Sequence, residues 1–419
     1  MDAAGSRVPS RPLLVVMLGL ATAIGPLSTD MYLPALPAMA DDLGVGPGAV
    51  QQSITWCLLG LAVGQLIGGA LSDRWGRRRP AVIGLAAYAI LTVLITPVPS
   101  VPLLIALRFM EGLAGGAGVA IARAVVRDLY SGTDAARVFS RLALIFGLAP
   151  ILGPALGSLV LRVTSWRGIF VVLGGLAVLV AALLAAKLPE TLPPSRRVGG
   201  GLAATVRSAK PIMRDHVFMG YAVAQGLAFS ALFGYLANGP FVLQDGYGLA
   251  PTAFGLLFGL NAVGITAFSQ ANARLLGRAT PRRLLLVGLT GLGVSGVVAL
   301  ASALLGNLPG LCAGLLLLTC SFGMTQPNSF ALALDRHPDR AGTASSVLGP
   351  LAPLLAALLA PLATLGPPGT GVPMALLILG CAVGSLLCVF ALTGDPLDQR
   401  RLAAASSPGD CRFRMGRST

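Results

Sequence analysis

Charge is scarce in this sequence. Only 11% of the 419 residues are Asp, Glu, Lys or Arg, whereas a soluble domain carries about a quarter of them. Hydrophobic residues make up 55% of the chain. Such a chain cannot cover a globular surface with charged groups, so a soluble protein is excluded. We expect an all-α integral membrane protein.

Residues that carry metal or nucleotide chemistry are also few. The chain has two histidines, His216 and His337, and its six cysteines form no C-x-x-C pair. It contains no G-x-x-x-x-G-K-[ST] phosphate-binding loop. These absences argue against an ATP-driven pump and against metal catalysis. We therefore expect a protein that is not an enzyme and that has no metal site and no cofactor.

Apolar runs of membrane-spanning length dominate the chain. A span needs about 20 residues. The sequence predicts twelve of them, at 13–36, 50–71, 80–97, 102–123, 138–161, 168–187, 217–238, 252–272, 283–306, 309–333, 342–365 and 371–393. An even number of spans places both termini on the same side of the membrane.

The lysines and arginines indicate which side that is. Nearly all 30 of them lie at the N-terminus, in the loops that follow even-numbered spans and in the C-terminal tail. Only Arg162 and Arg167 lie on the opposite face. The positive-inside rule predicts a multi-pass plasma-membrane protein with both termini in the cytoplasm. The net charge of +14 thus reflects topology and contact with lipid headgroups, not a nucleic-acid partner.

The spans divide into two groups of six. Residues 188–215, rich in Pro, Gly and Arg, separate an N-terminal six-helix half (1–187) from a C-terminal one (216–393), and residues 394–419 form a cytoplasmic tail. Two such pseudo-symmetric halves, with a binding site near the bilayer midplane, are typical of transporters.

The loop Gly69–Pro80 (G-A-L-S-D-R-W-G-R-R-R-P) is the most distinctive stretch between two spans. Gly76 allows a tight reversal. Asp73 is placed to cap a helix or to pair with Arg74 or Arg77. On charge alone the loop is an ordinary cytoplasmic loop. Its order of residues, however, resembles the signature between the second and third helices of the major facilitator superfamily.

Four further stretches resemble one branch of that superfamily, the drug:proton antiporters of the bicyclomycin/chloramphenicol-resistance (Bcr/CflA) type. They are Ser28–Pro37 (S-T-D-M-Y-L-P-A-L-P), Leu107–Tyr130 around Arg108, Ala149–Ser158 (A-P-I-L-G-P-A-L-G-S) and short matches such as E-T-L-P-P in the linker. The chain departs from the branch at Glu111, where a neutral residue is usual, and at Ser158, which replaces a glycine.

The resemblance implies roles for two groups of residues. The loop residues Gly69, Asp73, Arg74, Gly76 and Arg77 are expected to form a conformational latch. A kinked fifth helix with Gly147, Pro150, Gly153, Pro154 and Gly157 is expected to seal the seam between the halves against proton leak. The glycines of the fourth helix, including Gly112 and Gly116, predict close packing with a neighbouring helix.

Asp30, Arg108 and Glu111 are the ionisable residues that we place inside the spans. Each costs about 3 kcal/mol or more in hydrocarbon, so each is expected to face the bundle interior. If the first helix continues to Leu36, Asp30 and Arg108 lie at equal depth and are plausible partners. Glu111 is either the salt-bridge partner of Arg108 or a second proton-coupling group. We favour Asp30 as the main coupling site.

Neutral groups in the spans are candidates for contact with a substrate, although packing explains the aromatic ones equally well. These candidates are Tyr32, Gln225, Phe229, Phe233, Asn238 and Asn261. The resemblance implies a monomeric, proton-coupled secondary active exporter of small amphipathic drugs that works by alternating access. The alternative within the same fold is an importer or a nutrient symporter.

Overall fold

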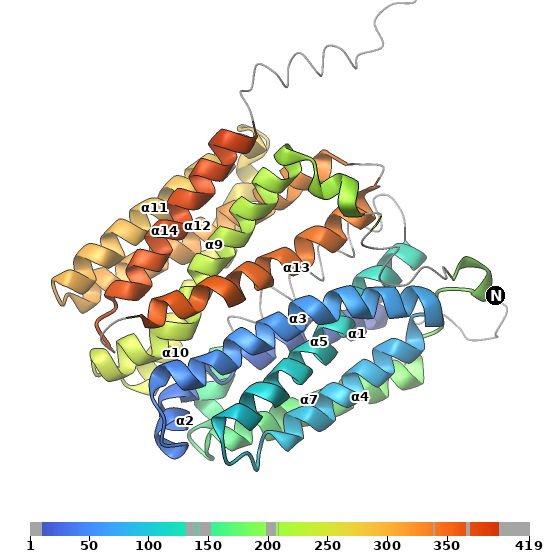
Figure 1. Cartoon of the computed structure of the whole chain (residues 1–419), viewed down its shortest axis with the longest axis horizontal. Coiled ribbons are helices and arrows are strands. Elements are labelled where there is room, and N and C mark those ends of the chain that lie inside the picture. Colours follow the sequence, from blue (N-terminus) through green and yellow to red (C-terminus); the bar gives the residue numbers. More distant parts are fainter. Residues whose placement is uncertain are drawn as a thin grey trace, which may run out of the picture.

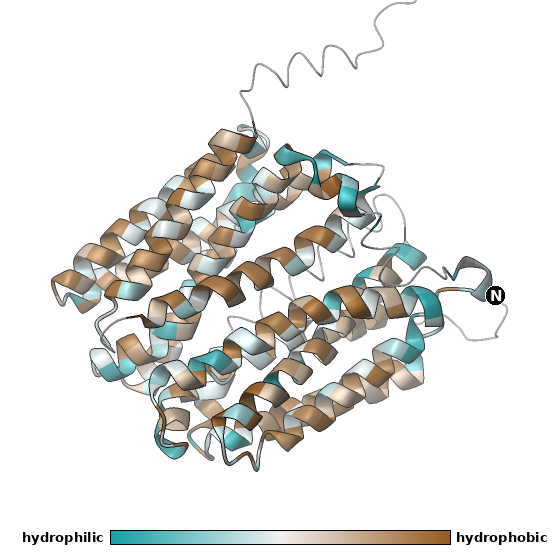
Figure 2. Ribbon diagram, in the orientation of Figure 1, coloured by the Kyte–Doolittle hydropathy of each residue, from teal (hydrophilic) through white to brown (hydrophobic). Residues whose placement is uncertain are grey.

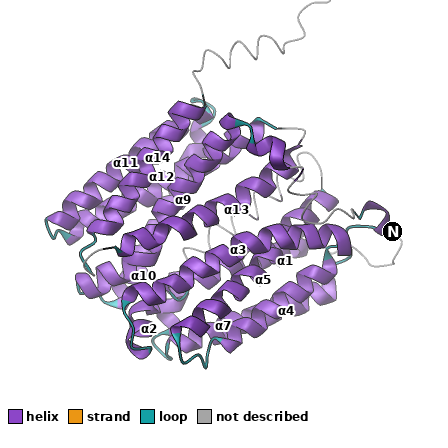
Figure 3. Cartoon of the chain, in the orientation of Figure 1, coloured by secondary structure: helices purple, strands orange, loops and turns teal. Residues whose placement is uncertain are grey.

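The computed structural model describes residues 11–130, 152–197, 209–337, 340–365 and 369–393, together with positions 138, 142 and 207. All regular elements in these ranges are helices (Figure 3). The first part of the chain forms α1 (Arg11–Asp30), η1 (Leu33–Ala35), α2 (Leu36–Asp42), α3 (Pro47–Trp75), α4 (Arg78–Leu94), α5 (Val101–Leu129) and α7 (Trp166–Lys187). The second part forms α9 (His216–Pro240), η3 (Phe241–Gly246), α10 (Pro251–Leu275), α11 (Pro281–Leu304), α12 (Leu308–Asp335), α13 (Ala341–Leu359), η5 (Ala360–Thr364) and α14 (Val372–Leu392).

The prediction of twelve spans agrees with this architecture. Ten helices among the described residues are long and apolar enough to cross a membrane. The helix α4, with 17 residues, and the helical residues 152–160 occupy the positions of the other two predicted spans. Hydrophobic residues cover the helix shafts and hydrophilic ones gather toward the ends of the bundle (Figure 2). The protein is therefore a multi-pass membrane protein.

The first span differs from the prediction of one helix over 13–36. The helix α1 ends at Asp30, and the chain continues through the short helix η1 into α2. Two prolines explain the break, because Pro34 and Pro37 have no amide hydrogen to donate to the carbonyl groups four residues earlier. Asp30 therefore lies at a helix end and not inside a continuous helix.

Helix starts follow local sequence signals. Proline occupies one of the first two positions of α3, α5, α10, α11, α12 and α14, where its missing amide hydrogen costs nothing. Asp215 caps α9 by accepting hydrogen bonds from the amides of Val217 and Phe218. The side chains of Thr280 and Asn307 cap α11 and α12 in the same way.

The helices α3 and α5 pack backbone to backbone, as the glycines of α5 predicted. A Cβ atom on Gly112 would lie 2.1 Å from the carbonyl oxygen of Cys57, and one on Gly116 would lie 2.3 Å from that of Leu61. Gly60 and Gly64 of α3 meet α5 equally closely. Only glycine permits this approach, so the prediction of close packing is confirmed.

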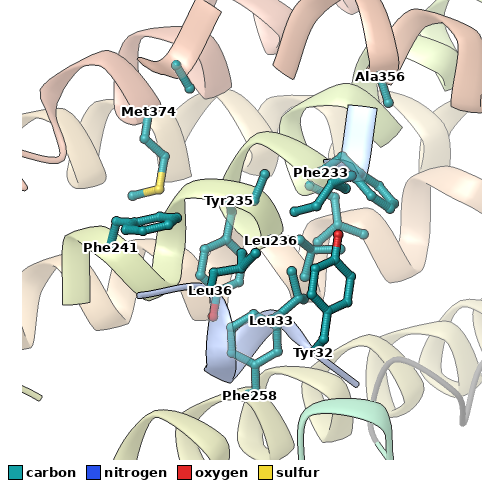
Figure 4. Close-up of a cluster of buried hydrophobic side chains, with 14 of the residues drawn as sticks. Tyr32, Leu33, Leu36, Phe233, Tyr235, Leu236, Phe241, Phe258, Ala356 and Met374 are labelled. Atoms are coloured by element: carbon teal, nitrogen blue, oxygen red, sulfur yellow. The ribbon is translucent and has the colours of Figure 1, made fainter. Parts of the chain in front are cut away.

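The hydrophobic core is shared between the halves at one end of the bundle only. We call the end that carries α2 and η3 the α2 end, and the end that carries the α3–α4 turn the linker end (Figure 1). At the α2 end, Tyr32, Leu33 and Leu36 pack in one buried cluster with residues of α9, α10 and α14 (Figure 4). Toward the linker end the cores are separate, one containing Leu85 and Val126 and the other containing Leu285 and Leu348.

Hydrogen bonds also join the halves at the α2 end. The buried amide of Gln51 on α3 donates to the side-chain oxygen of Asn238, at 3.1 Å, and to the carbonyl oxygen of Ala237, at 3.2 Å. The Gln244 amide reaches the carbonyl oxygen of Pro34 at 3.5 Å. The two halves are therefore held together by both apolar and polar contacts at this end.

We predict that Gln51→Leu opens the α2 end, because it removes both bonds to α9 and leaves the buried Asn238 oxygen without this donor. One net hydrogen bond contributes about 1 kcal/mol, so the open population should rise about fivefold. Maleimide labelling of a cysteine introduced at the buried Leu36, in nanodisc-embedded protein without native cysteines, measures this. The neighbouring exposed Gln52→Leu is the control, and equal labelling of the two variants would contradict the prediction.

Candidate functional site

A fully buried ion pair lies within α5. Arg108 and Glu111 are one turn apart, and the Nη1 group of Arg108 donates to the Oε2 atom of Glu111. The other carboxylate oxygen accepts hydrogen bonds from the hydroxyl groups of Ser28, at 3.0 Å, and Thr92, at 2.8 Å. Arg108 also donates to the Ser28 hydroxyl and carbonyl oxygens, at 2.7 and 3.0 Å. The charges cancel within a network that joins α1, α4 and α5.

Aromatic rings cover this ion pair. The guanidinium carbon of Arg108 lies 4.6 Å from the ring centroid of Tyr32 and 5.7 Å from that of Phe170. The Tyr32 hydroxyl forms a 3.1 Å hydrogen bond with the Ser53 hydroxyl on α3. Cation–π contacts of this kind strengthen when water is excluded. Arg108 is thus held by an acid on its own helix and by aromatic residues from the turn after α1 and from α7.

Asp30 is buried in a different environment. Its carboxylate accepts a hydrogen bond from the Thr29 hydroxyl at 3.1 Å, and it belongs to no ion pair among the described residues. The predicted pairing of Asp30 with Arg108 is therefore wrong in this structure. The reason is local: α1 ends at Asp30, and Ser28 instead of Asp30 faces the guanidinium group.

Residues 152–160, part of the predicted antiporter helix, pack directly on this break in the first span. A Cβ atom on Gly153 would lie 2.8 Å from the Cβ of Asp30, and one on Gly157 would collide with the carbonyl oxygen of Met31. A Cβ atom on Gly255 of α10 would lie 2.8 Å from the hydroxyl of Ser158 and 3.9 Å from the carbonyl oxygen of Pro154. The segment thus contacts Asp30 on one side and the second half on the other. Gly147 and Pro150 lie outside the described residues.

The loop between α3 and α4 is anchored by acidic residues from three segments. Arg77, which is largely buried, donates to Asp73 and, at 2.9 Å, to Asp128 at the end of α5. Its backbone amide donates to the Glu190 carboxylate at 2.7 Å. Gly76 has a φ of +90°, and a Cβ atom there would lie 2.3 Å from an oxygen of Glu190. Asp73 therefore pairs with Arg77, one of the partners expected for it.

Sequence reasoning gave no role to Asp128 or Glu190. Both lie in stretches that carry the family resemblance, R-D-L-Y and E-T-L-P-P. Because they are far from Arg77 in the sequence, their contacts with it could not be predicted. Arg74, which was expected to take part in the latch, is exposed. A Cβ atom on Gly69 would meet no other group, and the carbonyl oxygen of Gly69 accepts a hydrogen bond from the Ser72 hydroxyl. The anchors of the loop lie in the first half, except for Glu190, which lies at the start of the linker.

A smaller acid–base cluster lies at the linker end of the second half. Besides capping α9, Asp215 contacts Arg336 at 3.4 Å and His337 at 3.1 Å. Partial burial opposes ionisation, but the amide of Phe218 and the charge of Arg336 outweigh it and lower the pKa of Asp215 below its usual range. This cluster ties the beginning of α9 to the end of α12.

The candidate substrate residues occupy two settings. Tyr32 and Phe233 lie in the shared core, Asn238 bonds to Gln51, and Asn261 donates to the Tyr235 hydroxyl at 2.7 Å. In contrast, the ring of Phe229 is only partly buried, and it lies 4.9 Å from that of Phe233. The buried Gln225, one turn away, has a side-chain oxygen with no hydrogen-bond partner among the described residues. Among these candidates, Gln225 and Phe229 therefore have the most side-chain surface or hydrogen-bonding capacity left for a substrate.

We predict opposite effects for alanine at Gly69, in α3, and at Gly76, in the loop between α3 and α4. Gly76→Ala places a side chain in left-handed backbone and against Glu190, and should destabilise the protein by about 2 kcal/mol. Gly69→Ala, in a helix with free space, should stabilise it by about 0.5–1 kcal/mol. Thermal unfolding of both variants in detergent measures the difference. Equal melting temperatures would show that the anchored loop does not contribute to stability.

Comparison with known proteins supports the fold and family. Residues 18–361 match the Major Facilitator Superfamily model. A bicyclomycin resistance protein homolog of Haemophilus influenzae is 30% identical, over 93% of this chain and 98% of the relative. An uncharacterized MFS-type transporter of Bacillus subtilis, YdgK, is 35% identical, over 93% and 97%. The crystal structure of a D-xylose-proton symporter has a TM-score of 0.70 at 16% identity, covering 90% of this chain and 96% of that one. The chain therefore belongs to the Major Facilitator Superfamily, as its loop signature indicated.

Proposed function

We propose that this chain is a proton-coupled secondary active exporter of small amphipathic drugs, which works by alternating access. Its relatives support export, because they include a bicyclomycin resistance protein homolog and, at 29% identity, the multidrug resistance protein MdtL of Klebsiella pneumoniae. The sugar symporter resembles the chain in fold alone. An importer therefore has no specific support.

The observation that supports proton coupling is that two buried carboxyl groups, those of Glu111 and Asp30, have different partners. Glu111 is neutralised by Arg108 and receives two hydroxyl hydrogen bonds. Asp30 has one hydroxyl donor and no cation among the described residues. A buried carboxylate without a cation is costly when ionised, so Asp30 gains most from binding a proton. Asp30 is our proposed proton carrier, and Arg108 and Glu111 hold the surrounding helices in place.

The arrangement of the core suggests which step of the cycle this structure represents. The cations at the linker end and at both termini favour a cytoplasmic position for that end of the bundle. The shared core at the α2 end then lies on the outer side of the plasma membrane. The conformation is then closed to the outside, and Asp30 lies beneath that closed end. Opening there would expose Asp30 to external protons, which is what import of a proton in exchange for a drug requires.

The anchored loop between α3 and α4 has a proposed role in the same cycle. Arg77, Asp73, Asp128 and Glu190 fix the linker ends of α3, α5 and α7 as one unit. Such a unit lets the first half move as a rigid body during alternating access. The latch is thus proposed to stiffen one half, with Asp73 essential for transport. Gln225 and Phe229 are proposed to contact the drug.

Drug efflux itself is tested in a host that lacks its own efflux pumps. Cells expressing the chain should lower their content of the neutral fluorescent probe N-phenylnaphthylamine, and a protonophore should abolish the difference. A variant with Arg162→Gln, which changes an exposed side chain, serves as an expression-matched control. Efflux that continues after the proton gradient is dissipated would refute proton coupling.

We predict that Asp30→Asn abolishes uphill efflux but preserves drug binding, because the amide matches the shape of the carboxyl group and cannot exchange a proton. Proton release on drug binding, measured with purified protein in weakly buffered detergent, should disappear in Asp30→Asn and persist in Glu111→Gln. The assignment is reversed if Asp30→Asn still releases protons and Glu111→Gln does not.

A further inference from the structure

Arg123 is a cation that the transport machinery described above leaves unused. The predicted span 102–123 placed it at the membrane edge, but α5 continues to Leu129. Arg123 therefore lies on the helix, about 9 Å from its end. It is only partly exposed, and no carboxylate among the described residues lies within ion-pairing distance of it. Its charged neighbour is another arginine, Arg127, one turn further along.

The side chain of Arg123 points at the second half of the protein. A Cβ atom on Gly349 of α13 would lie 2.9 Å from the Nη1 atom of Arg123 and 2.9 Å from the Oε1 atom of Gln65 on α3. A guanidinium group and an amide from the first half therefore both approach Gly349 of the second half. They can do so because glycine has no side chain. No hydrogen bond of either side chain is found among the described residues.

The helix of the second half that faces this cation, α13, offers no group to neutralise it. The sequence of α13, AGTASSVLGPLAPLLAALL, contains no charged residue. Snorkelling to the membrane surface would be the ordinary use of such an arginine, and the exposed Arg127, one turn nearer the end of α5, is the residue placed for it. Arg123 is directed instead toward a helix of the other half. A partly buried cation without a counter-ion is costly, so an external anion would stabilise it.

We propose that Arg123 and Gln65, facing Gly349, form a binding site for the anionic group of an amphipathic monoanion, such as a carboxylate or sulfonate. The guanidinium group offers paired donors that match such a group. The Gln65 side chain presents its Oε1 atom toward Gly349, so its amide must turn over to bring the Nε2 donor to the anion. The apolar surface of α13 accommodates the hydrophobic body of the ligand. This inference rests on the proposed export function, for which it names a preferred substrate class. Both acids of α5 are already paired, Glu111 with Arg108 and Asp128 with Arg77, so neither is free to attract a lipophilic cation.

Two probes with the same ring system test this site. Anilinonaphthalene sulfonate is a monoanion, and N-phenylnaphthylamine is its neutral counterpart. Their binding to purified protein in nanodiscs, corrected for empty nanodiscs, is measured by equilibrium dialysis. Arg123→Gln should weaken sulfonate binding at least about tenfold, because a charge-assisted hydrogen-bonded contact is lost. Binding of the neutral probe should change by less than about twofold. Arg123→Lys, which keeps the charge but not the paired donors, should bind the sulfonate with an affinity between those of the wild type and Arg123→Gln.

The matched control is Arg127→Gln, which makes the same change of net charge one helical turn away and should affect neither probe. If Arg123→Gln does not fold, Gln65→Leu should weaken sulfonate binding alone, by about threefold. The proposal is overturned if the wild-type protein does not bind the sulfonate, if Arg123→Gln leaves its affinity unchanged, or if both probes lose affinity equally. Binding is measured without a proton gradient, so a failure of drug efflux would be recognised separately, from the cellular assay with the neutral probe.

Discussion

The buried ion pair between Arg108 and Glu111 is the constraint on which the first half depends. Two charges without access to water are tolerated only if they pair and if their remaining hydrogen-bonding groups are satisfied. Here Ser28, Thr92 and Tyr32 provide most of that environment, and they come from α1, α4 and the turn after α1. The Nε group of Arg108 is buried and has no hydrogen-bond partner among the described residues. The requirement to satisfy one charge pair therefore determines how three segments approach α5. The glycine contacts between α3 and α5 allow the backbones to come close enough for the arrangement.

Because Glu111 is committed to Arg108, Asp30 is left as a buried acid without a counter-charge. Its position joins three features: the end of α1, the segment 152–160 and the end of the bundle at which the halves are packed together. A proton bound or released there would alter the charge at the contact between the halves. Coupling between proton and conformation then needs no long pathway, because the proposed proton site lies beside the α2 end.

The sequence predicted the membrane class, the positions of the spans and the family, since hydropathy and the Gly69–Pro80 signature depend only on neighbouring residues. It also placed Asp73 beside Arg77, four residues apart on the chain. It did not predict that Asp128 and Glu190 would join them, because such contacts depend on how separate helices pack. The pairing of Asp30 with Arg108 failed for a local reason: depth was counted along a helix that Pro34 and Pro37 interrupt. The sequence did not single out Arg123, because the predicted span ended at residue 123, six residues before the observed end of α5.

The central claim is that Asp30, and not Glu111, exchanges a proton. Infrared difference spectroscopy of protein in nanodiscs measures this directly, because a protonated carboxyl group has a C=O band that the carboxylate lacks. On raising the pH, the wild-type protein should lose a band from a buried carboxylic acid. That band should be missing from Asp30→Asn and unchanged in Glu111→Gln. A band that persists in Asp30→Asn and vanishes in Glu111→Gln would contradict the account.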